Sequence, residues 1–109
     1  MTIPRPGDIW LADIPFTSGT QTKRRPVLIL WVDSQDVVVA VVTSAPPRTG
    51  TDVALRDWKQ AGLVVPSTVR LLRLDSLEGS LMLRQLGRIS RRDARSVMNV
   101  WVTDMQLRL

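Results

Sequence analysis

The sequence predicts a single domain of the mainly β (α+β) class, a small antiparallel sheet or barrel with a C-terminal helix. Its 109 residues are enough for one domain and too few for two of ordinary size, so we assign residues 1–109 to one unit. Short apolar runs separated by turn-forming residues predict about five to seven strands. The last apolar residues instead recur at helical spacing, which predicts a helix after the strands.

The strand predictions follow the apolar runs along the chain. We expect strands over Asp8–Asp13, Val27–Val32, Val37–Val42, Asp52–Leu55, Thr68–Leu74 and Leu81–Ile89. Pro26 is expected to open the second strand, a position where the missing N–H is tolerated. The segments Ile14–Lys23 and Ala45–Gly50 are expected as loops, and Asp33–Asp36 as a hairpin turn. Asp57–Ala61 is expected as one helical turn closed by Gly62.

The C-terminal helix is expected from about Arg91 to Gln106. The Ser90 hydroxyl can cap its first turn, and Asp93 three residues later gives a partial capping box. The apolar stripe that should pack on the sheet consists of Ala94, Val97, Met98, Trp101 and Met105. Three of the four tryptophans, Trp10, Trp31 and Trp101, are expected in the core.

The charge composition favours a polyanionic partner. The net charge is +5, with 13 Arg and 2 Lys against 10 acidic residues. Arginine presents a planar fork of donors that matches phosphate, so nucleic acid or an acidic peptide is the expected partner. The alternative is that these arginines only form a hydrated protein surface and bind no partner.

Other function classes are disfavoured by the composition. The chain has no Cys and no His, and its carboxylates are scattered singly, so no metal site and no cofactor are expected. No apolar run approaches the roughly 20 residues of a membrane helix. The N-terminal segment lacks a signal-peptide pattern. We therefore expect a cytoplasmic protein with no membrane partner.

The most informative candidate site is Arg25, which precedes an apolar strand. The next apolar strand ends in Thr43–Ser44. If the two strands pair, a guanidinium and two hydroxyls meet, which suits the binding of a phosphate. The alternatives are that Arg25 pairs with Asp8 or Asp75, and that Thr43–Ser44 only finish a strand.

The segment before Arg25 supplies further candidates for substrate binding. Lys23 and Arg24 add positive charge beside Arg25, and Phe16 is placed to stack on a base unless it anchors the loop in the core. The polar loop also contains Gly19 and Gln21. The substrate-binding candidates are therefore Phe16, Gly19, Gln21, Lys23, Arg24 and Ser44.

Taken in order, these pieces resemble the MazF/PemK family of toxins from bacterial toxin–antitoxin pairs. The matching stretches are Pro6–Asp13, Gly19–Leu28, Thr43–Ser44, Asp57–Leu63, Pro66–Arg70 and Leu83–Ser90. The chain departs from the family at Thr20–Lys23, which lacks the usual Glu-Gln and glycines, and at Leu72, where relatives often have an acidic residue.

The resemblance implies an SH3-like barrel and a homodimer. It also implies a metal-independent, sequence-specific endoribonuclease that cleaves single-stranded RNA through the neighbouring 2′-hydroxyl. The family's catalytic arginine and threonine match Arg25 and Thr43. An acidic antitoxin is the implied protein partner, with DNA contacted only through the antitoxin complex. The alternatives are a non-catalytic RNA-binding barrel and a gyrase-directed toxin of the same fold.

Overall fold

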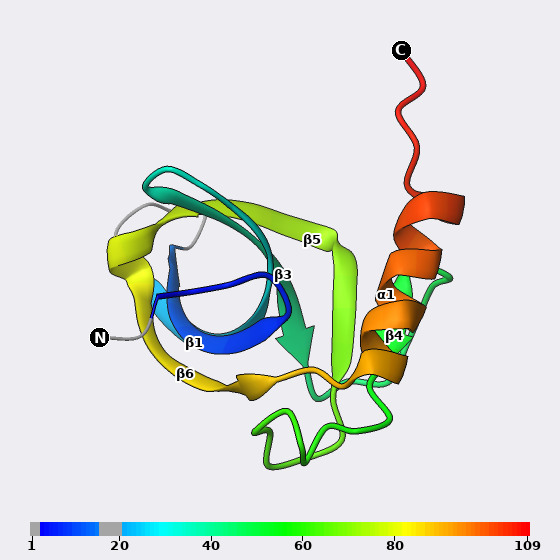
Figure 1. Cartoon of the computed structure of the whole chain (residues 1–109), viewed down its shortest axis with the longest axis horizontal. Coiled ribbons are helices and arrows are strands. Elements are labelled where there is room, and N and C mark those ends of the chain that lie inside the picture. Colours follow the sequence, from blue (N-terminus) through cyan, green and yellow to red (C-terminus); the bar gives the residue numbers. More distant parts are fainter. Residues whose placement is uncertain (1–2, 16–20) are drawn as a thin grey trace.

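The protein is a strongly curved antiparallel sheet with one helix packed on it (Figure 1). The computed structural model describes residues 3–15 and 21–109. In chain order the elements are β1 (Asp8–Pro15), β2 (Thr22–Asp33), β3 (Asp36–Thr43), β4 (Asp52–Ala54), β5 (Thr68–Glu78), a 3₁₀ turn η1 (Gly79–Leu81), β6 (Met82–Arg88) and α1 (Arg91–Asp104). The six strands pair in the order β4-β5-β3-β2-β1-β6. The predicted mainly β class with a C-terminal helix is confirmed, and in the described part of the chain no pairing between β4 and β6 closes the sheet.

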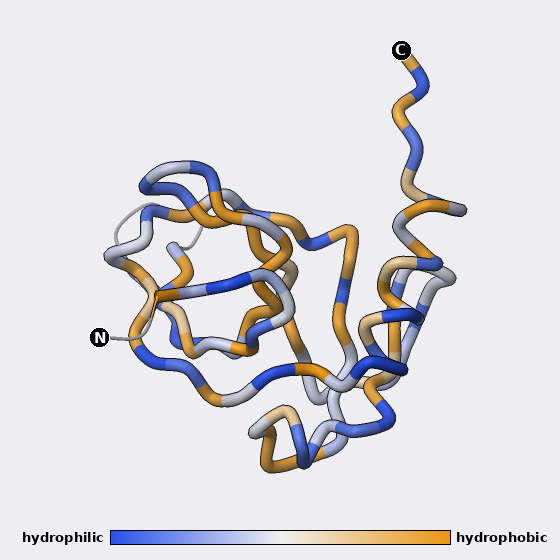
Figure 2. Tube along the Cα trace, viewed as in Figure 1, coloured by the Kyte–Doolittle hydropathy of each residue, from blue (hydrophilic) through white to orange (hydrophobic). Residues whose placement is uncertain are grey.

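Each face of the sheet carries its own apolar cluster, because successive residues of a strand point to opposite sides. The cluster on the face that α1 covers includes Ile9, Leu28, Ala40, Val42, Val53, Val69, Leu71 and Val97. The cluster on the opposite face consists of Trp10, Ala12, Val27, Ile29, Val37, Val39, Leu77 and Met82. Figure 2 shows the hydrophilic turn of the β2–β3 hairpin against these apolar strands. With apolar cover on both sides, β2 and β3 form the centre of the domain.

Several strand boundaries differ from the sequence prediction. The predicted loop Ile14–Lys23 is wrong at both ends, because β1 runs to Pro15 and β2 starts at Thr22. Pro26 consequently lies inside β2, opposite Leu11 of β1. The pairing of β2 with β3 begins only at Val27, so Pro26 has a strand partner on one side and its missing N–H is tolerated.

The expectation that three tryptophans lie in the core is correct for one of them and wrong for the other two. Trp10 is buried, whereas Trp31 is 44% exposed and Trp101 is partly exposed. The register of β2 against β3 shifts between Ile29 and Trp31, so one extra residue changes the alternation and brings Trp31 towards the surface. There it meets Trp101 of α1 edge to face, with ring centroids 6.0 Å apart.

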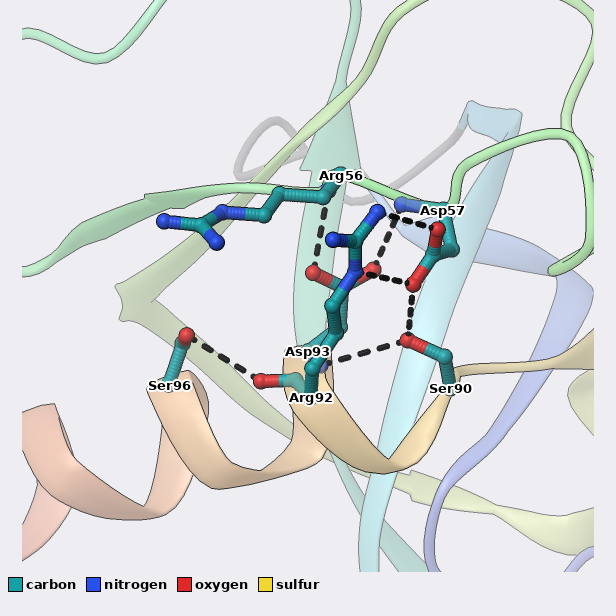
Figure 3. Close-up of polar contacts among 6 residues, drawn as sticks. All are labelled: Arg56, Asp57, Ser90, Arg92, Asp93 and Ser96. Carbon is teal, nitrogen blue, oxygen red and sulfur yellow. Dashed lines mark hydrogen bonds and ion pairs between the residues drawn. The ribbon is translucent and has the colours of Figure 1, made fainter.

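Polar contacts fix the start of α1 to the segment that follows β4 (Figure 3). The Ser90 Oγ accepts a hydrogen bond from the Asp93 N–H at 3.2 Å, as the predicted cap requires. The same hydroxyl donates to Asp57 at 2.6 Å, and the Arg92 guanidinium donates to both Asp57 oxygens at 2.7 Å. The carboxylate of Asp93 is buried and accepts from the N–H groups of Arg56 and Asp57, each at 2.9 Å. Side chains at the start of the helix thus donate to Asp57 and accept from the backbone of the same segment. The helix ends at Asp104, before the predicted Gln106.

The predicted helical turn after Asp57 is confirmed, since the Ala61 N–H donates to the Asp57 carbonyl at 3.1 Å. Gly62 closes it with φ at +88°, a backbone conformation that favours glycine. A side chain at Gly62 would collide with the backbone of Leu86, and one at Gly87 with the backbone of Ala61. The two glycines therefore allow this turn to pack directly on β6.

We expect Asp93→Ala to lower the free energy of unfolding by about 2–4 kcal/mol, because two backbone N–H groups would lose their charged acceptor in a buried site. Urea denaturation followed by circular dichroism measures this loss. Asp104→Asn, at the exposed end of the same helix, is the matched control and should change stability by less than about 0.5 kcal/mol. Equal losses in the two variants would contradict the role assigned to Asp93.

The Asp57 contacts predict a pH dependence of stability. Hydrogen bonds from Arg92 and then Ser90 lower the pKa of the Asp57 carboxyl from 3.8 to about 2. Because the folded-state pKa is the lower one, the stabilisation is complete above the unfolded pKa and is lost as the pH falls from 3.8 to about 2. The melting temperature of the wild-type protein should therefore fall more steeply in this range than that of Asp57→Asn. Parallel curves for the two proteins would contradict this prediction.

Candidate functional site

A cationic groove lies on the sheet face opposite α1, beside the ends of β2 and β3. Its volume is about 590 Å³. The lining residues are Ile14, Pro15, Lys23, Arg25, Val41, Thr43, Ala45, Arg48, Arg70, Arg73, Leu74 and Asp75. Residues from β1, β2, β3 and β5 and from the segment after β3 therefore meet in one hollow.

The register of β2 against β3 explains why Arg25 and Thr43 share this groove. Val27 pairs with Val41 at the end of the antiparallel ladder, and Arg25 and Thr43 each lie two residues beyond this last pair, where both line the groove. The pleat places both on the same face as Val27. Arg25 is partly exposed, and the Thr43 Oγ1 accepts a hydrogen bond from the Ala45 N–H at 3.2 Å. That acceptor role leaves the hydroxyl hydrogen of Thr43 able to donate to a ligand.

The groove carries an excess of positive charge. Its charged lining residues are Lys23, Arg25, Arg48, Arg70 and Arg73 against Asp75. In the described part of the chain, the ion pairs are made by other cations: Arg24 with Asp13, Arg88 with Asp8 and Arg92 with Asp57. The proposed pairing of Arg25 with Asp8 is thereby ruled out, because Arg88 binds that carboxylate at 2.9 Å. An anionic ligand would therefore find cations that no ion pair neutralises among the described residues.

The candidate residues predicted from the sequence fall into three groups. Arg25, Thr43 and Lys23 lie together in the groove. Arg24, Ser44 and Gln21 are exposed but are not among its lining residues. Arg24 points to the other side of β2, where it pairs with Asp13 across the β1–β2 ladder at 3.5 Å, so its charge lies on the face opposite the groove. Phe16 and Gly19 lie outside the described residues.

Four charged groove residues were not predicted as site residues: Arg48, Arg70, Arg73 and Asp75. Arg48 follows β3, and the other three lie on β5. The β3–β5 ladder jumps from Val41–Arg70 to Ala40–Leu74, which leaves three extra residues in β5. Only this irregular register, which has no signature in the sequence, brings Arg73 and Asp75 to the groove.

The described residues bear on two further features, a metal site and a membrane-spanning helix. They contain no group of three or more His, Cys, Asp or Glu side chains placed to hold a metal ion. Within the same ranges, residues 3–15 and 21–109, no helix has the length and hydropathy needed to cross a membrane.

A small antiparallel sheet with a cationic groove on one face defines the class: a compact β protein with an excess of positive charge in one groove. The sequence identifies the protein family within this class. Residues 5–100 match the family of PemK-like, MazF-like toxins of type II toxin–antitoxin systems, and the chain belongs to this family. A comparison with curated protein sequences finds no match.

Solved structures of this family have the same fold. An endoribonuclease from mycobacterial species superposes with a TM-score of 0.75 at 18% identity, covering 100% of this chain and 97% of that one. The Mycobacterium tuberculosis toxin MazF-mt6 gives 0.74 at 22% identity, covering 94% and 99%. A MazE–MazF structure from Deinococcus radiodurans gives 0.72 at 19% identity, covering 99% and 100%. Another mycobacterial endoribonuclease of this fold was solved in complex with its cognate antitoxin, with a TM-score of 0.76 and 17% identity, covering 97% and 98%.

Proposed function

We propose that this toxin is a sequence-specific, metal-independent endoribonuclease that cleaves single-stranded RNA and thereby inhibits growth. The observation that carries the proposal is the meeting of Arg25 and Thr43 in a groove with four further cations. RNA phosphates suit such a groove, because arginine forks bind phosphate oxygens in pairs. The names of the similar structures, endoribonuclease and MazF toxin, support the same reaction.

The proposed reaction is an attack by the 2′-oxygen on the adjacent phosphorus. The new bond joins the 2′-oxygen to phosphorus, and the bond from phosphorus to the 5′-oxygen breaks. This leaves a 2′,3′-cyclic phosphate and a 5′-hydroxyl. Arg25 would stabilise the negative charge that develops on the phosphorane, and Thr43 would donate a hydrogen bond to one of its oxygens. The leaving 5′-oxygen takes a proton from water, which reaches it through the open groove.

The proton of the 2′-hydroxyl needs an acceptor, and we assign this role to Asp75. A guanidinium keeps its proton at neutral pH, so Arg25 is a poor base. Asp75 is the only carboxylate that lines the groove among the described residues. A carboxylate within reach of the 2′-hydroxyl can accept its proton as a general base. The cations then provide the charge stabilisation that a metal ion provides in other nucleases.

We expect Arg25→Ala to lower the rate of RNA cleavage by roughly 10²–10³-fold, since an oxyanion-stabilising group is lost. Thr43→Ala should cost roughly tenfold, the value of one hydrogen bond to a charged oxygen. Asp75→Asn should cost roughly 10²–10⁴-fold, as for a general base. Cleavage of labelled single-stranded RNA in the presence of EDTA measures all three effects.

The matched control is Arg95→Ala, which removes the same charge as Arg25→Ala from the exposed side of α1 and should keep the wild-type rate. Loss of activity in EDTA would contradict metal independence. Wild-type activity in a folded Arg25→Ala variant would contradict the mechanism. Binding of RNA by the wild-type protein without cleavage would favour the non-catalytic alternative.

We also propose a homodimer and an acidic antitoxin that occupies the groove. The exposed apolar residues Met98 and Val102 on α1 support association through the helix, being 60% and 64% exposed. The groove's positive charge supports an acidic segment as inhibitor, because cations that attract phosphates also attract carboxylates.

We expect light scattering to show a dimer at micromolar concentration and Val102→Asp to weaken it, because a charge at an apolar interface loses its hydration. If RNA and the antitoxin compete, added RNA should raise the apparent dissociation constant of the toxin–antitoxin complex. The increase should grow with the ratio of the RNA concentration to the dissociation constant of RNA. A monomeric wild-type protein would contradict the dimer. An antitoxin whose affinity RNA does not change would contradict competition for the groove.

A further inference from the structure

The groove continues beyond Thr43 into a second hollow of about 380 Å³. The second hollow is lined by Arg48, Thr49, Asp52, Arg70, Leu72 and Arg73. Three of these residues, Arg48, Arg70 and Arg73, also line the first groove. The two hollows therefore adjoin at three arginines, on the side of the first groove that faces β4 and β5.

The backbone of Arg48 is held by a hydrogen-bonded turn. Its N–H donates to the Asp52 carboxylate at 2.9 Å, and the Asp52 N–H donates to the Thr49 carbonyl at 3.1 Å. The hydroxyls of Thr49 and Thr51 are 3.0 Å apart and share a hydrogen bond. These bonds fix the main chain without using the Arg48 guanidinium, whose side chain remains exposed. The backbone that carries this charge is thus held in place beside the two hollows.

The two other arginines come from β5. Arg70 lies between two strands, paired with Val41 of β3 and with Asp52 of β4. Arg73 is the last of the three extra residues of β5, where the pairing of β5 with β3 is interrupted. Among the described residues, no ion pair joins any of the three arginines to a carboxylate. Three arginines therefore line both hollows, and within the described structure none of them forms an ion pair.

We propose that Arg48, Arg70 and Arg73 form a second phosphate-binding subsite, which holds the RNA backbone next to the phosphodiester at Arg25 and Thr43. This inference rests on the proposed function. A polymer bound at the first groove must leave it in two directions, and the second hollow continues it on the Thr43 side. The RNA strand then runs from Ile14 and Pro15, past the reacting phosphate, towards Leu72. Leu72 is 66% exposed and offers an apolar contact for a base beside the arginines.

The test measures binding and cleavage separately. Fluorescent single-stranded uridine oligonucleotides of about 4 to about 16 nucleotides are titrated with wild-type protein, Arg48→Gln and the control Arg95→Gln. The wild-type protein should bind the longer oligonucleotides with higher affinity than the shorter ones. In Arg48→Gln the affinity for the longer oligonucleotides should be roughly tenfold lower, with little change for the shorter ones. In a plot of log affinity against log salt, the slope for the long oligonucleotides should become less steep by about 0.7–1 in Arg48→Gln. Arg95→Gln, an equal change in charge on α1, should leave both quantities at the wild-type values.

The outcomes separate this inference from the proposed function. Cleavage by the wild-type protein, with equal binding of long oligonucleotides by Arg48→Gln and wild type, would overturn the subsite alone. The expected length and salt effects without any cleavage would support the subsite and overturn the nuclease. If Arg48→Gln weakens only the binding of an acidic peptide and leaves RNA unaffected, the arginines serve a protein partner and the proposal is wrong. Retention of the circular dichroism spectrum confirms that the variant is folded.

Discussion

The register that pairs Val27 of β2 with Val41 of β3 is the constraint on which the site depends. With Val27 opposite Val41, Val27 and Ile29 of β2 and Val37 and Val39 of β3 are buried in one apolar cluster. A slip of one residue would turn every side chain of one strand to the other face, which would expose Val27 or Val39. The same slip would separate Arg25 from Thr43. The burial of the core therefore also fixes the geometry of the groove.

The groove forms where this face of the sheet changes from apolar to polar. Along β3 the face carries Val37, Val39, Val41 and then Thr43, and along β2 it carries Val27 and then Arg25. The first residues of each series belong to the buried cluster, and the last lie at its margin. A guanidinium next to apolar surface is less screened by water than one on an open face, so its attraction for a phosphate is stronger. The apolar cluster thus supports the site electrostatically as well as sterically.

The part of the structure that the sequence predicted is the part controlled by local pattern. The apolar runs predicted six strands at about the observed positions, and Ser90 predicted the start of α1. Arg25 and Thr43 were expected to meet because each flanks a predicted apolar run, and both line the groove. Arg24 was grouped with Arg25 by its charge alone, although alternation from Val27 places Arg25 and not Arg24 on the groove side. Arg73 and Asp75 could not be found in this way, because three extra residues in β5 break the period that such reasoning needs.

The charges of the protein are divided between two regions with opposite character. Carboxylates at Asp8, Asp13 and Asp57 are paired with arginines, and Asp93 is buried against backbone N–H groups, so these acids stabilise the fold. The groove instead gathers five cations around one carboxylate, and their mutual repulsion opposes folding. An anion that binds there relieves the repulsion and stabilises only the folded state. RNA and an acidic antitoxin would relieve the same repulsion, so each would reduce the stabilisation left for the other, and the proposed competition has an electrostatic basis as well as a steric one.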